Sequence, residues 1–297
     1  MPSPAAKRGE AKQAAQGQDF IMACVGNDNA SPSGKRCIVT SNSKTKMVNL
    51  AAAIRDEFPQ RKTIVITSDT RLNEAEVRQF IGSPAKLAEA YHAVFASPSI
   101  GTGVDIAFPG KAQVFDVVFG FCEAQITTHL EFDQQLARVR HPGEVKVWVN
   151  PRRFHFETEF DVVKRDALER SLFKNLLIGY ADTGEPEYQE NDAFLEMASL
   201  ILSEQRASKN DLKANFIRHK QKQGFRIEHV QRDEDLSADG LGVLVRGRHL
   251  HEEALRQTIL AAKTLPETEF VRLRDALRAG EFAPASERTI SSLCQTF

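Results

Sequence analysis

Five short apolar runs, rich in β-branched residues, occupy the first half of the chain, and polar or helix-patterned segments separate them. Runs that are apolar throughout predict strands buried on both faces, which is typical of parallel sheets, whereas burial of one face gives alternation. The runs lie at 37–40, 63–67, 93–97, 114–119 and 145–149. We therefore expect five parallel strands joined by right-handed crossovers.

Helical periodicity fills the gaps between these runs. After the first run, apolar side chains recur at i, i+3, i+4 and i+7, as on one face of a helix. These side chains are Met47, Leu50, Ala51, Ile54 and Phe58. A second helix is expected either within 73–81 or directly after Pro84, and a third at 128–140. The alternation predicts an α/β doubly wound domain over 36–155, preceded by a flexible segment at 1–35.

Beyond this domain the strand signal fades, and the pattern predicts a mainly α-helical region over 156–297. Its helix-patterned segments are 161–180, 191–206, 209–223, 252–262 and 267–279. Ser208 and Asp211 bracket the start of the third of these segments in a capping-box arrangement. A short pair of strands is expected at 225–230 and 242–245.

The composition excludes several classes of protein. A formal net charge of -1 gives no global attraction to nucleic acid, so any DNA contact must come from local basic patches. The four cysteines form no Cys-x-x-Cys pair, which disfavours a zinc site and a disulfide framework. No apolar run approaches the roughly 18 residues that a membrane span needs. We expect a cytoplasmic protein that has no contact with a membrane.

The residues just after the predicted strands are polar. Ligands of doubly wound sheets gather where the strands end, and hydroxyl and backbone N–H groups there suit phosphate oxygens. The polar side chains of interest after the first and third runs are Thr40, Ser41, Lys44, Ser99 and Thr102. Taken one loop at a time, they are better explained as ordinary helix caps.

Two arginines follow the fourth run. Arg138 stands four residues after Gln134, so a helix over 128–140 would place the two on one face, with Arg140 on a neighbouring face. A guanidinium group that one lobe supplies to a triphosphate on another neutralises the transferring phosphoryl group. The alternative is that both arginines are solvated charges at a helix C-terminus.

The order of these segments carries a family resemblance. The loop SPSIGTGVD at 97–105, the pair FD at 115–116 and the segment QQLARVR at 134–140 resemble motifs V and VI of superfamily 2 helicases. More narrowly, they are similar to herpesvirus-type origin-binding helicases and to plasmid replication proteins of cyanobacterial type. In this resemblance 37–44 corresponds to motif IV. The likeness covers 36–155, and more weakly 210–230.

The resemblance implies a RecA-like second helicase lobe with specific site residues. Arg138, with Arg140 as a second candidate, would contact the γ-phosphate, and Gln134 would order them. Gly101, Gly103 and Asp105 would couple the nucleotide to the strand-end loops. The DNA backbone contacts would be Thr40, Ser41, Lys44, Ser99 and Thr102. His141 stands where many helicases have a last arginine, which leaves the division of roles between the two arginines open.

Half of the motor is missing from this sequence. A helicase also needs a Gly-x-x-x-x-Gly-Lys-Ser/Thr loop and an acidic strand end that holds magnesium. Gly34-Lys35 precedes Arg36, and Gly110-Lys111 precedes Ala112, so neither pair completes such a loop. ATP and Mg²⁺ are therefore expected to bind only with a complementary first lobe, in trans or from a longer parent chain.

Three explanations remain for the missing half: a fragment or split gene, a part of a larger helicase, or a degenerate relative. The predicted function is the second motor lobe of an ATP-dependent DNA helicase or translocase in replication initiation at a plasmid or mobile-element origin. The alternative is an ATP-independent DNA-binding or scaffold protein that kept the fold.

The sequence also carries weaker signals. A dinucleotide fold is disfavoured because Ile106 stands where its third glycine would be, and His249 and His251 have no companion ligands for a metal site. A basic stretch predicts either a nucleic-acid contact or a solvated helix face. Its predicted DNA contacts are Lys213, Arg218, Lys220 and Lys222, with Phe216 and Phe225 between and after them.

Overall fold

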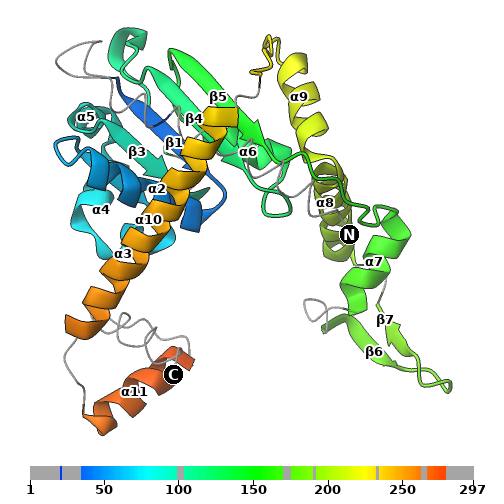
Figure 1. Cartoon of the computed structure of the whole chain (residues 1–297). Helices are drawn as coiled ribbons and strands as arrows, with labels where there is room; N and C mark the ends of the chain where they lie inside the picture. The colour runs from blue at the N-terminus through cyan, green and yellow to red at the C-terminus, as the bar shows by residue number, and fades with distance from the viewer. Residues whose placement is uncertain are drawn as a thin grey trace. The chain divides into compact units, whose positions relative to one another are not determined.

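A five-stranded parallel sheet forms the centre of the first part of the chain (Figure 1). The structure, a computed structural model, describes residue 21 and residues 35–98, 104–169, 175–189, 192–231, 234–261 and 266–278. The strand order is β2-β3-β1-β4-β5. The strands are β1 (Cys37–Ser41), β2 (Thr63–Ile66), β3 (Ala93–Ala96), β4 (Val117–Cys122) and β5 (Glu144–Val149). The predicted α/β fold with a parallel sheet is thus confirmed.

Burial follows the place of each strand in the sheet: β1, β3 and β4 are buried throughout, as their apolar runs predict, whereas β5 lies at the edge and is largely exposed, so the burial predicted for it is wrong. β1 pairs in parallel with both β3 and β4, and β2 pairs in parallel with β3. The Glu144 N–H donates to the Asp116 carbonyl, and the Asn150 N–H donates to the Cys122 carbonyl. In both bonds the donor stands equally far along the chain from its acceptor, so β5 runs parallel to β4 as well. Every residue of β1, the central strand, is buried.

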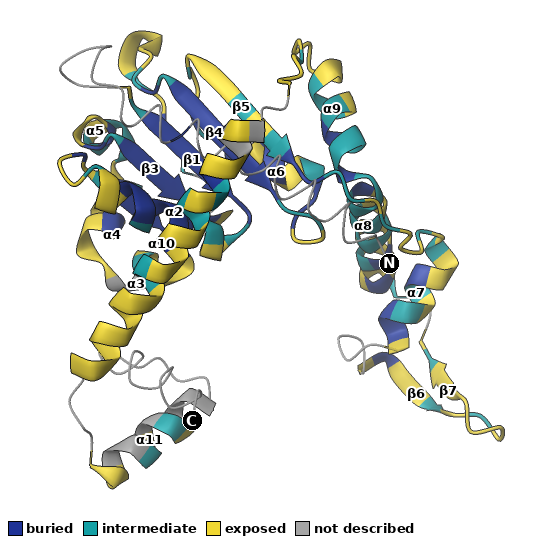
Figure 2. Ribbon diagram, viewed as in Figure 1, coloured by how far each residue is buried: buried dark blue, intermediate teal, exposed yellow. Residues whose placement is uncertain are grey.

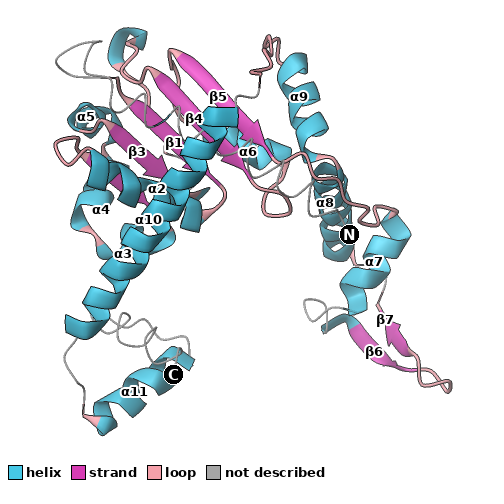
Figure 3. Ribbon diagram, in the orientation of Figure 1, coloured by secondary structure: helices cyan, strands magenta, loops and turns pink. Residues whose placement is uncertain are grey.

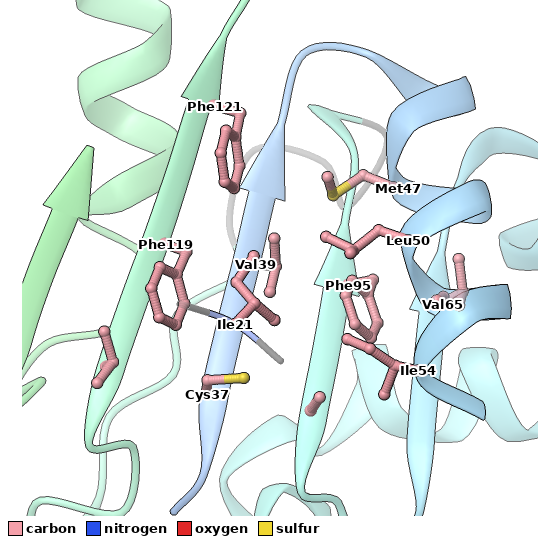
Figure 4. Packing of buried hydrophobic residues seen from close by; sticks show 13 residues of the cluster. Ile21, Cys37, Val39, Met47, Leu50, Ile54, Val65, Phe95, Phe119 and Phe121 are labelled. Atoms are coloured by element: carbon pink, nitrogen blue, oxygen red, sulfur yellow. The ribbon is translucent and has the colours of Figure 1, made fainter. Parts of the chain in front are cut away.

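One face of the sheet packs against helix α2 (Lys44–Glu57). Figure 4 shows Val39 and Phe95 from the strands opposite Leu50 and Ile54 from the helix, and all four side chains are fully buried. Ser43 caps α2, because its hydroxyl accepts a hydrogen bond from the Lys46 N–H. The helix predicted from the spacing of its apolar residues is confirmed.

The other face of the sheet is covered too. Ile64, Val94 and Val118 point to the side opposite α2, by the alternation of side chains along a strand, and are buried. Helix α4 contacts β2 and buries Val77 and Phe80 completely. The helical segments between β2 and β4 are α3 (Ser68–Asn73), α4 (Ala75–Gly82), α5 (Pro84–Leu87), the 3-10 helix η1 (Ala88–Ala90) and the 3-10 helix η3 (Pro109–Lys111).

The chain forms two compact units. The sheet unit comprises Met1–Phe121, Leu136–Trp148 and Gln231–Phe297, and the helical unit comprises Cys122–Gln135 and Val149–Val230. Helix α6 spans His129–Leu136, and its residues up to 135 belong to the helical unit. The other elements of that unit are α7 (Phe160–Glu169), β6 (Leu177–Tyr180), β7 (Pro186–Tyr188), α8 (Ala193–Asn210) and α9 (Leu212–Lys222). Its small apolar core holds Ala167, Leu168, Leu176 and Leu195 from α7, α8 and the residue before β6.

The last part of the chain belongs with the sheet unit, although the sequence placed all of 156–297 in one helical region. Helix α10 (Glu234–Ala261) packs along α2, and Val243 reaches the core between α2 and the sheet. Arg246 forms an ion pair with Glu57 at the end of α2. α11 (Glu267–Arg278) follows in the same unit. In Figure 2 the part of α10 after the α2 contact is largely exposed.

A glycine makes the contact between α10 and α2 possible. A Cβ atom added to Gly247 would lie 2.0 Å from the Asn49 carbonyl oxygen and 3.2 Å from the Ala53 Cβ. The backbones of the two helices therefore approach each other more closely than any larger residue allows. No property of the sequence around Gly247 showed that α2 would be its neighbour.

Several predicted boundaries are wrong in the second half. The expected strand at 242–245 lies inside α10, and 225–230 forms no strand (Figure 3). The segment 161–180 was predicted as one helix, but its last four residues form strand β6. α8 runs through Ser208 to Asn210, so Asp211, whose side chain accepts from the Ala214 N–H, is the cap of α9. Of the predicted flexible segment 1–35, only Ile21 and Lys35 lie within the described residues.

We predict that Gly247→Ala destabilises the sheet unit by about 1–3 kcal/mol, the usual cost of overpacking, because its methyl group meets the α2 backbone. Gly242→Ala is the matched control, since a Cβ there meets nothing within 4 Å and alanine is the better helix former. The measurement is the free energy of unfolding in urea. Equal stabilities of the two variants would contradict the close approach of the helices.

Candidate functional site

The residue that follows the motif V-like segment lies beside the arginines of the motif VI-like segment. Ile106 and Val139 form a parallel bridge, in which the Ile106 N–H donates to the Arg138 carbonyl at 2.8 Å and the Arg140 N–H donates to the Ile106 carbonyl at 3.2 Å. Both bridge side chains are buried, at 1% and 5% exposure. We call residues 137–141 the arginine segment. The bridge fixes its backbone against the chain that follows β3.

The bridge also brings Asp105 to Arg140. The Arg140 Nε donates to the Asp105 Oδ1 at 2.7 Å, and both side chains are about half exposed. Asp105 raises the pKa of Arg140 through this hydrogen bond and through its charge. Two of the residues singled out from the sequence are thus in direct contact.

Arg138 has a different environment. Its side chain is half-buried, and this burial lowers its pKa from the ordinary value of an arginine. An arginine stays charged in proteins despite such shifts. A charge partly withdrawn from water acts more strongly on a neighbouring phosphate than a solvated one does. Of the two arginines, Arg138 therefore has the stronger potential to stabilise a phosphoryl group.

The prediction that both arginines lie on a helix with Gln134 is wrong. α6 ends at Leu136, and the arginine segment turns into the bridge with Ile106. The helix stops because Val139 is drawn into the apolar core as the partner of Ile106. Gln134 lies on α6 and is exposed.

The hydroxyl groups at the end of β1 serve the protein's own structure. Thr40 and Ser41 are 4% and 0% exposed, and the Ser41 Oγ accepts a hydrogen bond from the Ser43 N–H at 3.0 Å. Buried hydroxyl groups of this kind are unsuited to the DNA contact predicted for them. Lys44 is exposed and forms an ion pair with Asp69, which follows β2. The ordinary capping interpretation also holds after β2, where Thr67 and Thr70 form a capping box.

Four other predicted site residues lie outside the described residues. They are Ser99, Gly101, Thr102 and Gly103. The predictions for the nucleotide-coupling glycines and for two of the DNA contacts therefore stay predictions.

The basic stretch on α9 divides into inner and outer residues. Lys220 points inward and is only 16% exposed, since its Nζ lies 2.6 Å from the Asp133 Oδ1. Arg218 and Lys222 are exposed, and Lys213 is partly exposed. The structure thus leaves Lys213, Arg218 and Lys222 available at the surface, whereas Lys220 is occupied within the unit.

Asp133, in the helical unit, is a buried charged residue that the sequence did not indicate. Its carboxylate is 12% exposed and receives hydrogen bonds from Lys220, from Gln223 Nε2 at 2.9 Å, and from His219, whose Nε2 lies 3.0 Å away. We call these four residues the Asp133 clasp. Burial by itself raises the pKa of Asp133, but the hydrogen bonds from Lys220 and Gln223 and the charge of Lys220 outweigh it, so the pKa is lowered. The partners stand 86 to 90 residues away, beyond the reach of local patterns.

A second polar contact on α6 joins it to α8. The Ser208 Oγ accepts from the His129 N–H at 3.0 Å and lies 2.7 Å from the His129 Nδ1. The Ser208 hydroxyl proton then points to Nδ1, which favours neutral His129 with its proton on Nε2. Burial is the largest cause that lowers the pKa of His129; His219 and Arg218 lower it further, and Asp133 opposes them.

Comparison of the chain with protein-family models, with curated proteins and with solved structures gives no match. Among the described residues no three His, Cys, Asp or Glu side chains are grouped so as to hold a metal ion. The described helices also include none with the length and apolar character needed to cross a membrane. The helicase resemblance therefore rests on the motifs of this chain and on its fold.

We predict that the stability of the helical unit falls as the pH drops below the ordinary His pKa of 6.5, and that His129→Asn weakens this dependence. The folded state lowers the pKa of His129, so the unfolded chain binds the proton more readily and acid favours unfolding. An asparagine keeps an acceptor for Ser208 but does not titrate. The measurement is the Tm between pH 5 and 7.5. The same slope in His129→Asn and in the wild type would contradict this prediction.

Proposed function

We propose that the sheet unit is the second motor lobe of an ATP-dependent DNA helicase or translocase. The observation that supports this most is the bridge between Ile106 and Val139. It joins the end of the motif V-like segment to the motif VI-like segment and brings Asp105 to Arg140. The resemblance implies that these two segments act together on one nucleotide, so their contact is the arrangement that this function requires.

The arginine segment would act on a triphosphate that a first lobe holds. Guanidinium groups suit the three terminal oxygens of a γ-phosphate, and a segment fixed by a backbone bridge presents them without reorganisation. Arg138 would supply the main charge, and Arg140 would exchange Asp105 for phosphate when the lobes close. ATP, with Mg²⁺ held on the first lobe, supplies the phosphoryl transfer that drives translocation.

The proposed setting is replication initiation at a plasmid or mobile-element origin, in the cytoplasm. The motif likeness to plasmid replication proteins and origin-binding helicases supports it. DNA would be the partner of the outer residues of α9 and of Lys44. A first lobe, in trans or from a longer chain, is the second partner, because the 297 residues hold no complete phosphate-binding loop.

One observation favours the alternative, an ATP-independent DNA-binding or scaffold protein. The exposed cations Lys213, Arg218 and Lys222 stand on α9 in the helical unit, which does not contain the arginine segment. Binding of DNA by that unit would need no nucleotide. The two functions differ in whether Arg138 matters.

We predict that Arg138→Ala lowers the ATPase rate of this chain mixed with a candidate first lobe by about 1,000-fold or more, the effect typical of an arginine finger. Arg248→Ala is the control, since it removes an exposed arginine that is paired with Glu252 in the sheet unit. The measurement is steady-state phosphate release. If both variants keep the stimulation of the wild type, the arginine-finger role is excluded and the alternative function stands.

We also predict that Lys222→Gln reduces the slope of log K against log salt for duplex DNA by up to about 0.9, the value for one phosphate contact. Arg165→Gln, at an exposed position on α7, removes one charge from the same unit and should leave the slope unchanged. Fluorescence anisotropy at several salt concentrations gives both slopes. Equal slopes for the two variants and the wild type argue against the contact on α9.

A further inference from the structure

Two phenylalanines of the helical unit stack on each other in the segment 150–159, which leads into α7 and contains neither helix nor strand. The centroids of the Phe154 and Phe156 rings lie 5.5 Å apart, and the ring planes make an angle of 14°. Phe154 is partly exposed, and Phe156 is 38% exposed. We call these two residues the phenylalanine pair. Phenylalanine is normally drawn into a core, so a stacked pair in contact with water calls for an explanation.

Asn210, the last residue of α8, holds the pair in place. The Phe154 N–H donates to the Asn210 carbonyl at 2.9 Å, and the Phe156 N–H donates to the Asn210 Oδ1 at 2.7 Å. The Asn210 Nδ2 donates in turn to the Phe156 carbonyl at 3.0 Å. One asparagine thus satisfies the backbone groups that a neighbouring strand would otherwise pair. The rings stand on a fixed backbone, so a flat ligand would find them already ordered.

Cations gather at the end of α8 and along α9. Lys209 and Lys213 stand directly before and three residues after the asparagine that holds the pair, and both are partly exposed. Within the described residues neither of these two lysines forms an ion pair. Arg218 is exposed further along α9, whereas the Asp133 clasp takes up Lys220. The surface beside the phenylalanine pair therefore offers positive charge to a ligand.

Two carboxylates near the pair are already occupied. Asp211 caps α9, and its Oδ2 lies 3.1 Å from the Arg153 Nε. The Glu157 carboxylate accepts hydrogen bonds from the N–H groups of Thr158 and Glu159, at 2.7 and 2.8 Å. Neither carboxylate neutralises the two lysines, which suits a ligand that carries phosphate groups.

Single-stranded nucleic acid combines the two chemical features that this surface fits. Its bases stack on aromatic side chains while its phosphates follow cations, and every base has a face that can stack. A duplex keeps the faces of its bases inside its own stack, so it offers none of them to the pair. Exposed rings beside lysines thus favour an unpaired strand over a duplex.

We infer that the phenylalanine pair is a stacking site for an unpaired base of single-stranded DNA, with Lys209 and Lys213 beside the adjacent phosphates. The choice of DNA as the ligand rests on the proposed function. That function assigned the outer cations of α9 a contact with the phosphates of a duplex. The stacking site adds a contact within the same unit that only the separated strand can make.

The test is the affinity of the full chain, without nucleotide or first lobe, for an oligothymidine of about 12 nucleotides, a length that single domains cover. Phe156→Leu keeps an apolar side chain and loses the aromatic face, so it should weaken this binding about 10-fold, as loss of one stacked base does. Its affinity for duplex DNA should stay at the wild-type value, which also shows that the unit is folded. Tyr180→Leu, at an exposed aromatic residue of β6, is the matched control and should alter neither affinity.

A second variant reports on the stacking itself. Phe156→Trp should bind the oligothymidine as tightly as the wild type does, because indole offers a larger face. Its added fluorescence should be quenched on binding, since a stacked base quenches indole emission. The chain holds one tryptophan, Trp148, so the wild type supplies the background signal.

Three outcomes would overturn the inference: equal single-strand affinities of Phe156→Leu and the wild type, equal weakening by Tyr180→Leu, or binding of Phe156→Trp without quenching. The ATPase assay with a first lobe is a separate measurement, and a lack of stimulation there removes the motor function but not the stacking site. If the wild type binds duplex DNA and only the single-strand results fail, the proposed DNA partner stands without the stacking site. A wild type that binds no DNA removes both.

Discussion

The complete burial of β1 is the constraint on which the sheet unit depends. All five of its residues are buried, with β3 and β4 on its two sides and apolar side chains on both faces. Close packing on both faces fixes the register of this strand, because a shift of one residue would move each side chain to the opposite face, into a space filled by a side chain of another shape. The ends of β3 and β4 are thereby fixed, and from these ends the chain continues to Ile106 and to α6.

The sequence correctly indicated the elements that patterns within a few residues determine. It missed the features that contacts between residues far apart in the chain determine. The burial of β1 and the apolar face of α2 are visible as runs and periodicity within a few residues. The end of α6 is set by the pairing of Val139 with Ile106, which stands 33 positions earlier, and the place of α10 is set by the contact between Gly247 and Asn49. Periodicity identifies a helix but does not tell which element will lie against it.

The same limit applies to the site. Lys220 and Lys222 look alike in a basic stretch, yet Asp133 draws only Lys220 inward. Thr40 and Ser41 read as polar residues at a strand end, but the turn after β1 and the packing around it bury both. The motif order singled out Asp105 and Arg140 separately, and their ion pair comes from the bridge between Ile106 and Val139, which no local pattern shows.

The exposure of the Asp105–Arg140 pair makes it sensitive to ionic strength. Mobile ions screen solvent-exposed charges over about 8 Å at physiological salt, and over shorter distances as salt rises. Rising salt will loosen Arg140 from Asp105, whereas the half-buried Arg138 is screened less. The placement of the Arg140 side chain thus depends on the buffer: dilute salt keeps it on Asp105, and concentrated salt releases it.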